Sequence, residues 1–227
     1  MSVRLEINPK LDIGAFARAY AQHGIVRVPD VLTPGSAEAV SQILEKTPWE
    51  PQWSETGESA AARDTAVLAR ARAGFAYRYL HYRMVDAYLD GQDPGLPIHG
   101  VTEFLNGSPF VGLMRAITAR QDIVKAMAIA TNFRPGDFLT WHDDSAQDQS
   151  DFRACAYTLS FSKLWRPDWG GQLLFHDTQG QIASGMAPMF NCLNLFSVPR
   201  PHSVAPVAPY AGAPRLSIVG WGRTDKQ

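Results

Sequence analysis

The segment TWHDDSAQ, residues 140–147, contains residue types that bind metal ions. His142 and Asp144 are separated by one residue, and residues i and i+2 of an extended strand point to the same side. An imidazole nitrogen and a carboxylate oxygen placed in this way can bind one divalent ion. Asp143 then points to the other side, so we do not choose it as a ligand. Because His-x-Asp triplets are common by chance, the alternative is a solvated polar loop.

A third ligand would distinguish a metal site from a solvated loop. His202 follows a predicted strand and lies 60 residues after His142, a separation that several antiparallel strands can span. His176, at the end of another predicted strand, is the rival candidate. Two histidines and one carboxylate leave open positions on the metal, an arrangement that suits the non-haem iron(II) oxygenases.

A buried cation in the same cavity would indicate that the iron ion works with an acidic cosubstrate. One large class of these enzymes takes electrons from 2-oxoglutarate, which chelates iron through its keto acid and needs a cation for its far carboxylate. Arg215 lies 13 residues after His202, at the start of an apolar stretch where an unpaired charge is costly to bury. Ser217 lies on the same strand face and can donate to the same carboxylate. The alternative is an arginine at an exposed strand end in a surface ion pair.

The strand predicted over residues 153–162 is a candidate wall of the same cavity. Its alternation places Thr158 and Ser160 with two alanines on one face and larger apolar residues on the other. The first face is small and slightly polar, as a wall beside a bound dicarboxylate should be, so both residues are candidates for cofactor binding. An ordinary half-exposed strand is the alternative.

The elements that must position these residues change character near residue 123. We predict one domain over residues 1–227, in which residues 1–122 form a mostly helical support and residues 123–227 form a β core with the metal site. The predicted helices cover residues 12–24 and 33–48, a long or broken helix at 62–90, and a helix that begins near Ser108. The predicted strands cover residues 124–133, 153–162, 170–177, 191–198 and 214–223, a spacing typical of an antiparallel sandwich or barrel.

The composition argues against several other classes of protein. The formal net charge of −1 disfavours nucleic-acid binding, because nothing in it would attract a phosphate backbone. No apolar run reaches the roughly 20 residues of a membrane span, and the first residues do not resemble a signal peptide. Two cysteines, Cys155 and Cys192, do not make a disulfide scaffold and suit a reducing cytoplasm, where we expect the protein to act.

Four motifs together resemble a known family. RPGDFLTWHDD, WGGQLLFHD, NLFSVPRPHSV and PRLSIVGWGR occur in the order and spacing of the Fe(II)/2-oxoglutarate-dependent oxygenases. More narrowly, they resemble the prolyl-hydroxylase-like group, which includes ribosomal-protein and hypoxia-sensing prolyl hydroxylases. The resemblance covers residues 130–223. It implies a double-stranded β-helix, or jelly roll, buttressed by the N-terminal helices: a mainly β protein with flanking helices.

The resemblance also implies roles for individual residues. It implies that His142, Asp144 and His202 bind catalytic iron(II), and that Arg215, assisted by Ser217, anchors the C5 carboxylate of 2-oxoglutarate. Ascorbate is a further candidate, as a reductant.

The sequence departs from the group at two positions. Phe133 stands where many members have a tyrosine before the PGD turn, and Ser160 stands where many have a second tyrosine that faces 2-oxoglutarate. These departures predict a wider or wetter cofactor pocket.

The implied activity is hydroxylation of a C–H bond with dioxygen, during which 2-oxoglutarate is converted to succinate and carbon dioxide. We expect a peptidyl proline of a protein or peptide as substrate. One alternative is a free amino acid or another small metabolite, and a further alternative is a jelly-roll binding module without catalysis. The sequence leaves the oligomeric state open.

Overall fold

The computed structural model describes residues 4–145 and 152–224, and the α-helices of this part of the chain all end before residue 119. Helix α1 ends where Gly24 adopts a left-handed conformation and donates its N–H to the carbonyl of Tyr20. Helix α2 begins after Thr33 with a proline at its first position, as predicted. The helices are α1 (Ile13–His23), α2 (Pro34–Glu45), α3 (Ala60–Ala73), α4 (Met84–Leu89), α5 (Ile98–Asn106) and α6 (Ser108–Thr118).

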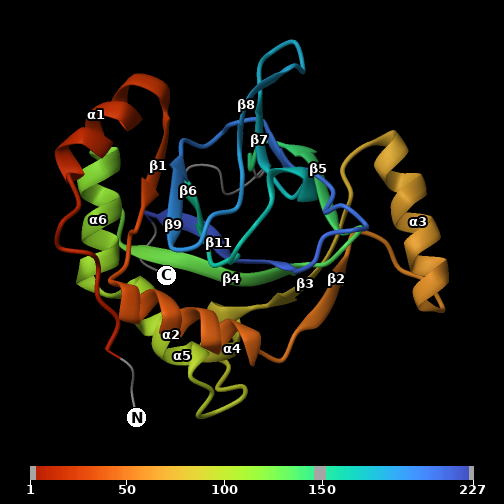
Figure 1. Ribbon diagram of the computed structural model, residues 1–227, viewed down its shortest axis with the longest axis horizontal. Helices are drawn as coiled ribbons and strands as arrows, with labels where there is room; N and C mark the ends of the chain where they lie inside the picture. The colour runs from red at the N-terminus through yellow and green to blue at the C-terminus, as the bar shows by residue number, and fades with distance from the viewer. Residues whose placement is uncertain (1–3, 146–151, 225–227) are drawn as a thin grey trace.

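The strands form one antiparallel sheet in the order β1-β9-β6-β11-β4-β3-β5-β10-β7-β8, with β2 paired to β3 (Figure 1). The pairing of β3 with β5 is short, at the point where the order passes from one half of the sheet to the other. The strands are β1 (Ile25–Pro29), β2 (Glu50–Trp53), β3 (Tyr77–Tyr82), β4 (Lys125–Phe133), β5 (Phe138–His142), β6 (Arg153–Ser160), β7 (Leu173–His176), β8 (Ile182–Met186), β9 (Cys192–Phe196), β10 (His202–Val204) and β11 (Arg215–Arg223).

The sheet folds over so that its two halves face each other. Phe196 of β9 and Phe175 of β7 are far apart in the strand order, yet their rings pack edge to face at 5.1 Å. Arg27 of β1 also reaches across to donate to the carbonyl of Ala187, just after β8. Buried apolar side chains between the halves exclude water and hold the roll closed. The predicted jelly roll with flanking helices is confirmed.

The helices support one half of the roll from outside. Helices α4 and α5 contact β4, α2 contacts α5, and α1 contacts both β1 and α6. Figure 1 shows α3 at the opposite end of the molecule from α1 and α6, and α3 contacts β3. The apolar faces of α2, α4, α5 and α6 pack with residues of β4, β6, β9 and β11 in one large core, whereas Val67 of α3 packs with Ala76 and Phe138 in a separate cluster. Among the described residues, no helix combines the length and the apolar character that crossing a bilayer requires.

One prediction about the first half was wrong. The stretch 62–90, expected to be a long or broken helix, contains β3 between α3 and α4. Gly74 ends α3, and the aromatic residues that follow favour the pleated surface of a strand. Helix α5 was not predicted either. Strands β1 and β3 pair with β9 and β4, so the first half of the chain contributes to the sheet as well as supporting it.

Candidate active site

The His-x-Asp segment is held by a turn, and the expected strand alternation is wrong. Strand β5 ends at His142, and Asp144 has a left-handed φ of 63°. The carboxylate of Asp143 accepts hydrogen bonds from the backbone N–H and hydroxyl of Ser145, which lower its pKa and close a local turn. The carbonyl of Asp143 accepts from the N–H of Arg200. This turn, and not a pleat, brings the Asp144 side chain back beside His142; the last two residues of TWHDDSAQ lie outside the described residues.

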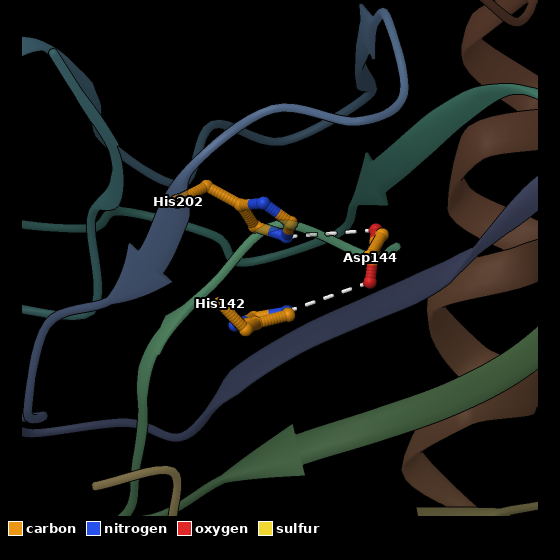
Figure 2. A group of neighbouring side chains, drawn as sticks. All are labelled: His142, Asp144 and His202. Atoms are coloured by element: carbon orange, nitrogen blue, oxygen red, sulfur yellow. Dashed lines mark ion pairs between the residues drawn. The ribbon is translucent and has the colours of Figure 1, made fainter. Parts of the chain in front are cut away.

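Pairing of β5 with β10 brings the two histidines together. His142 and His202 are direct partners in this register, which closes the 60-residue separation. His142 Nε2 lies 3.6 Å from Asp144 Oδ1, and His202 Nε2 lies 3.7 Å from Asp144 Oδ2 (Figure 2). One ligand atom from each of the three residues lies within 4.8 Å of the others. The predicted group of three side chains therefore converges on one point.

Backbone carbonyls orient both imidazole rings. His142 Nδ1 lies 2.9 Å from the carbonyl oxygen of Thr140, and His202 Nδ1 lies 2.7 Å from that of Arg200. A carbonyl only accepts, so each Nδ1 carries a proton and each Nε2 is directed to Asp144. Burial, and then the neighbouring His142, lower the pKa of His202. His202 is therefore neutral at neutral pH, which is the state that binds a metal.

Two residues absent from the sequence predictions hold Asp144. Trp221 Nε1 donates to Asp144 Oδ2 at 3.0 Å, and Arg153 Nη1 donates to the Asp144 carbonyl oxygen at 2.7 Å. The guanidinium of Arg153 also lies over the Trp221 ring, 4.1 Å from its centroid. Residues 215, 217, 219 and 221 of β11 share one face of the strand. The sequence could therefore have predicted that Trp221 faces the cavity together with Arg215.

A cavity of about 330 Å³ connects the three side chains with Arg215. Arg215 is 3% exposed, and its Nε has no hydrogen-bond partner in the described part of the chain. Its Nη1 donates to Ser217 Oγ at 2.9 Å, and Ser217 Oγ is 3.0 Å from Thr131 Oγ1. Burial lowers the pKa of Arg215 to about 10, so it remains charged at neutral pH. No described carboxylate forms an ion pair with Arg215, and such a group needs an anionic partner.

The predicted wall residues have different positions. Thr158 lines the cavity, and its Oγ1 accepts a hydrogen bond of 2.9 Å from Asn194. Ser160 is buried opposite Ser217 in the register of β6 with β11, but it is not among the residues that line the cavity. The rival ligand His176 bonds to the hydroxyl of Ser203 and is not part of the group of three.

One glycine makes room for Arg215. Gly171 has a φ of 65°, and a Cβ there would lie 3.2 Å from Arg215 Cδ and 3.1 Å from the Trp165 ring. This glycine belongs to the WGGQLLFHD motif of the sequence, and glycine permits such a close approach.

Strand β3 and Phe75, two residues before it, supply an aromatic wall that the sequence predictions missed. Phe75, Tyr77 and Tyr79 all line the cavity, with successive ring centroids 5.5 and 5.6 Å apart. At one end, Phe75 lies 5.3 Å from the His142 ring; at the other, Tyr79 stacks on Phe133 at 4.7 Å. Phe75 is 43% exposed, so this end of the wall is open to solvent.

Comparisons with known proteins agree with this site. Residues 128–223 match the family model described as the 2OG-Fe(II) oxygenase superfamily. This segment contains His142, Asp144, His202 and Arg215. No curated protein sequence matches the chain.

Solved structures share the fold over nearly the whole chain. A prolyl-4-hydroxylase from Pseudomonas putida has a TM-score of 0.65 at 23% identity, covering 94% of this chain and 99% of that one. A 2OG-Fe(II) oxygenase family oxidoreductase from Burkholderia pseudomallei has a TM-score of 0.68 at 12% identity, covering 98% and 96%. A Trichoplax adhaerens prolyl hydroxylase, in complex with a hypoxia inducible factor oxygen degradation domain peptide fragment, has a TM-score of 0.63 at 17% identity, covering 94% and 90%.

The family match over residues 128–223 confirms the resemblance to the iron(II)- and 2-oxoglutarate-dependent oxygenases and indicates a dioxygenase. The superfamily implies iron(II) and 2-oxoglutarate as cofactors. Within this class, the fold is that of the prolyl-4-hydroxylase-like enzymes.

Proposed function

We propose that this protein hydroxylates a peptidyl proline of a protein substrate, with release of succinate and carbon dioxide. The observation that carries the proposal is a buried guanidinium, without an ion pair to any described carboxylate, in the same cavity as two histidines and a carboxylate that converge. A metal site by itself does not explain a buried Arg215, and a buried arginine by itself does not explain the two histidines. A cosubstrate that binds the metal at one end and has a carboxylate at the other explains both.

The donor set fits iron(II). His142 and His202 offer their Nε2 atoms, and Asp144 offers a carboxylate oxygen, the two-histidine and one-carboxylate set of the non-haem iron oxygenases. The hydrogen bond from Trp221 fixes the orientation of the Asp144 carboxylate. Bound iron would supply the site at which dioxygen is activated.

The far end of the cavity fits the C5 carboxylate of 2-oxoglutarate. Arg215 would bind it, and the hydroxyl of Ser217 keeps the guanidinium in place. Thr158 would contact the chain between the two carboxylates from the wall. The residues around the cavity are mostly apolar, so they exclude water from this end. We keep ascorbate as a proposed reductant.

The open end of the cavity suits an uncharged, compact side chain. Phe75 presents an exposed ring beside His142, against which the apolar ring of proline can pack. Arg153 lines the cavity as well, and its buried Nε has no hydrogen-bond partner in the described part of the chain. Arg153 can donate to a backbone carbonyl of the substrate, a group that a peptide provides on both sides of the proline.

The test has two stages. Under anaerobic conditions, iron(II) and 2-oxoglutarate should give the visible absorption band of a chelated keto acid, and His142→Ala should abolish it. With dioxygen, proline-containing peptides should gain one oxygen atom by mass spectrometry, in step with succinate formation. Oxidation of free amino acids alone would favour the small-metabolite alternative. Absence of succinate above background with every substrate mixture would favour the binding module.

The aromatic end of the wall can be tested separately. Phe75→Ala should raise the KM for a peptide substrate while leaving the anaerobic absorption band unchanged, because Phe75 lies outside the group that binds metal. An unchanged KM would remove Phe75 from the substrate contacts.

A further inference from the structure

Tyr79 carries a hydroxyl group that has no hydrogen-bond partner among the described residues. It lies on β3 and lines the cavity together with Arg215 and Phe133. Its hydroxyl makes no hydrogen bond to any residue that the structure describes, whereas the hydroxyl of Tyr77 accepts one from Gln52. A phenol facing a largely apolar cavity gains free energy from any acceptor that arrives there.

Tyr79 and Arg215 lie on the two sides of Phe133. The Tyr79 ring stacks on Phe133 with an interplanar angle of 17° and a centroid distance of 4.7 Å. The Arg215 guanidinium lies 5.2 Å from the centroid of the same ring, and Arg215 is the direct register partner of Phe133 across β11 and β4. Phe133 has no polar atom to offer a ligand bound between them. Tyr79 and Arg215 therefore lie on the two strands that flank Phe133, and both line the cavity that a carboxylate bound by Arg215 would occupy.

We propose that Tyr79 donates a hydrogen bond to the distal carboxylate of 2-oxoglutarate, alongside Arg215. The proposal rests on the proposed function and adds a ligand-binding residue to it. Tyr79 lies outside residues 128–223, the segment that matches the family model, so the N-terminal half of the chain would complete the cofactor site. Its hydroxyl would take the place of one that Phe133 lacks.

The protonation state of Tyr79 suits this role. Burial raises the pKa of the Tyr79 hydroxyl above its ordinary value, so the group keeps its proton at neutral pH and can donate it to a carboxylate. Hydrogen bonds to a charged acceptor are among the stronger ones in proteins.

The competing explanation is that Tyr79 only packs against Phe133. Tyr79→Phe separates the two, because it keeps the ring and removes the hydroxyl. The matched control is Tyr77→Phe, which removes a hydroxyl from the same strand face and the same cavity wall.

The experiment measures binding without turnover. Each variant is titrated anaerobically, in the presence of iron(II), with 2-oxoglutarate and with 2-oxopentanoate, a keto acid that lacks the distal carboxylate. We expect Tyr79→Phe to raise the Kd for 2-oxoglutarate about 10-fold and to leave the Kd for 2-oxopentanoate unchanged, since a hydrogen bond to a charged group contributes about 1.5 kcal/mol or more. Tyr77→Phe should change neither Kd. Thermal unfolding of each variant checks that the fold is intact.

Two results would overturn the proposal. One is an unchanged Kd for 2-oxoglutarate in Tyr79→Phe, and the other is an equal rise for both keto acids, which would indicate packing alone. Two other results would contradict the proposed function itself and not only the role of Tyr79. The wild-type protein would give no absorption band, or Arg215→Met would leave the affinity for 2-oxoglutarate unchanged.

Discussion

Arg215→Met should have opposite effects on folding and on ligand binding. Arg215 is buried in the ligand-free protein, and no described carboxylate forms an ion pair with it. Methionine fills a similar volume without a charge. The variant should therefore be more stable than the wild-type protein when no ligand is present, and it should bind 2-oxoglutarate much more weakly.

The structure sets the size of both effects. Lowering the pKa of Arg215 from 12.5 to about 10 corresponds to about 3 kcal/mol by which burial disfavours the charged form. The variant loses the hydrogen bond to Ser217, which offsets about 1 kcal/mol of this gain. We expect the free energy of unfolding to rise by about 1–3 kcal/mol. Removing one partner of a buried charge pair costs at least about 2 kcal/mol, so the Kd for 2-oxoglutarate should rise about 30-fold or more.

Urea denaturation of the ligand-free protein measures the first effect, and anaerobic titration with iron(II) and 2-oxoglutarate measures the second. The matched control is Arg78→Met. Arg78 is also largely buried, but it forms ion pairs with Asp64 and with Asp137, whose side chain is 2% exposed. The same substitution there should destabilise the protein by about 3 kcal/mol, because it leaves a carboxylate in the interior without its partner.

Loss of stability in ligand-free Arg215→Met, of the size seen in Arg78→Met, would refute the reasoning. It would mean that the charge of Arg215 stabilises the folded protein through an internal partner, and that binding a ligand is not needed to explain its burial. An unchanged Kd for 2-oxoglutarate would separately exclude Arg215 as the anchor.

Other residues give sharper tests of single contacts. Trp221→Phe removes the hydrogen bond to Asp144 and should weaken iron(II) binding about 10-fold in competition with a chelating dye; unchanged affinity would show that this bond does not tune the metal site. His176→Ala should leave the anaerobic absorption band intact, whereas loss of the band would return His176 to the ligand set. Gly220→Ala should destabilise the protein by about 3 kcal/mol or more in urea, because the new Cβ would lie 1.8 Å from the Met127 carbonyl oxygen; a fully stable variant would contradict the tight β11–β4 contact.

Local sequence signals predicted the elements whose boundaries depend on local chemistry. Gly24 ends α1, and Thr33 with Pro34 begins α2, because caps and proline act within one turn of the chain. The five strands predicted in the second half all occur, since each is short, apolar and bounded by turn residues. Strand β3 was missed because its aromatic residues follow a helical stretch directly, and its pairing with β4 is a long-range contact.

The structure brings together the three side chains that the sequence singled out, but part of the geometry expected for them was wrong. The types and spacing of His142, Asp144 and His202 were sufficient to select them, because few side chains can bind iron(II). Strand alternation did not bring Asp144 to His142; the turn at Asp143 did, and a turn depends on hydrogen bonds that alternation cannot predict.

The sequence by itself determined which chemistry is available: a metal-binding donor set, a cation in an apolar strand and the motifs of a 2-oxoglutarate oxygenase. Only the tertiary structure decided that no described carboxylate pairs with Arg215, that Trp221 and Arg153 hold Asp144, and that Tyr79 shares the cavity. The physical reason is that burial and pairing are properties of neighbours in space. Those neighbours come from strands that are joined only when the sheet folds over on itself.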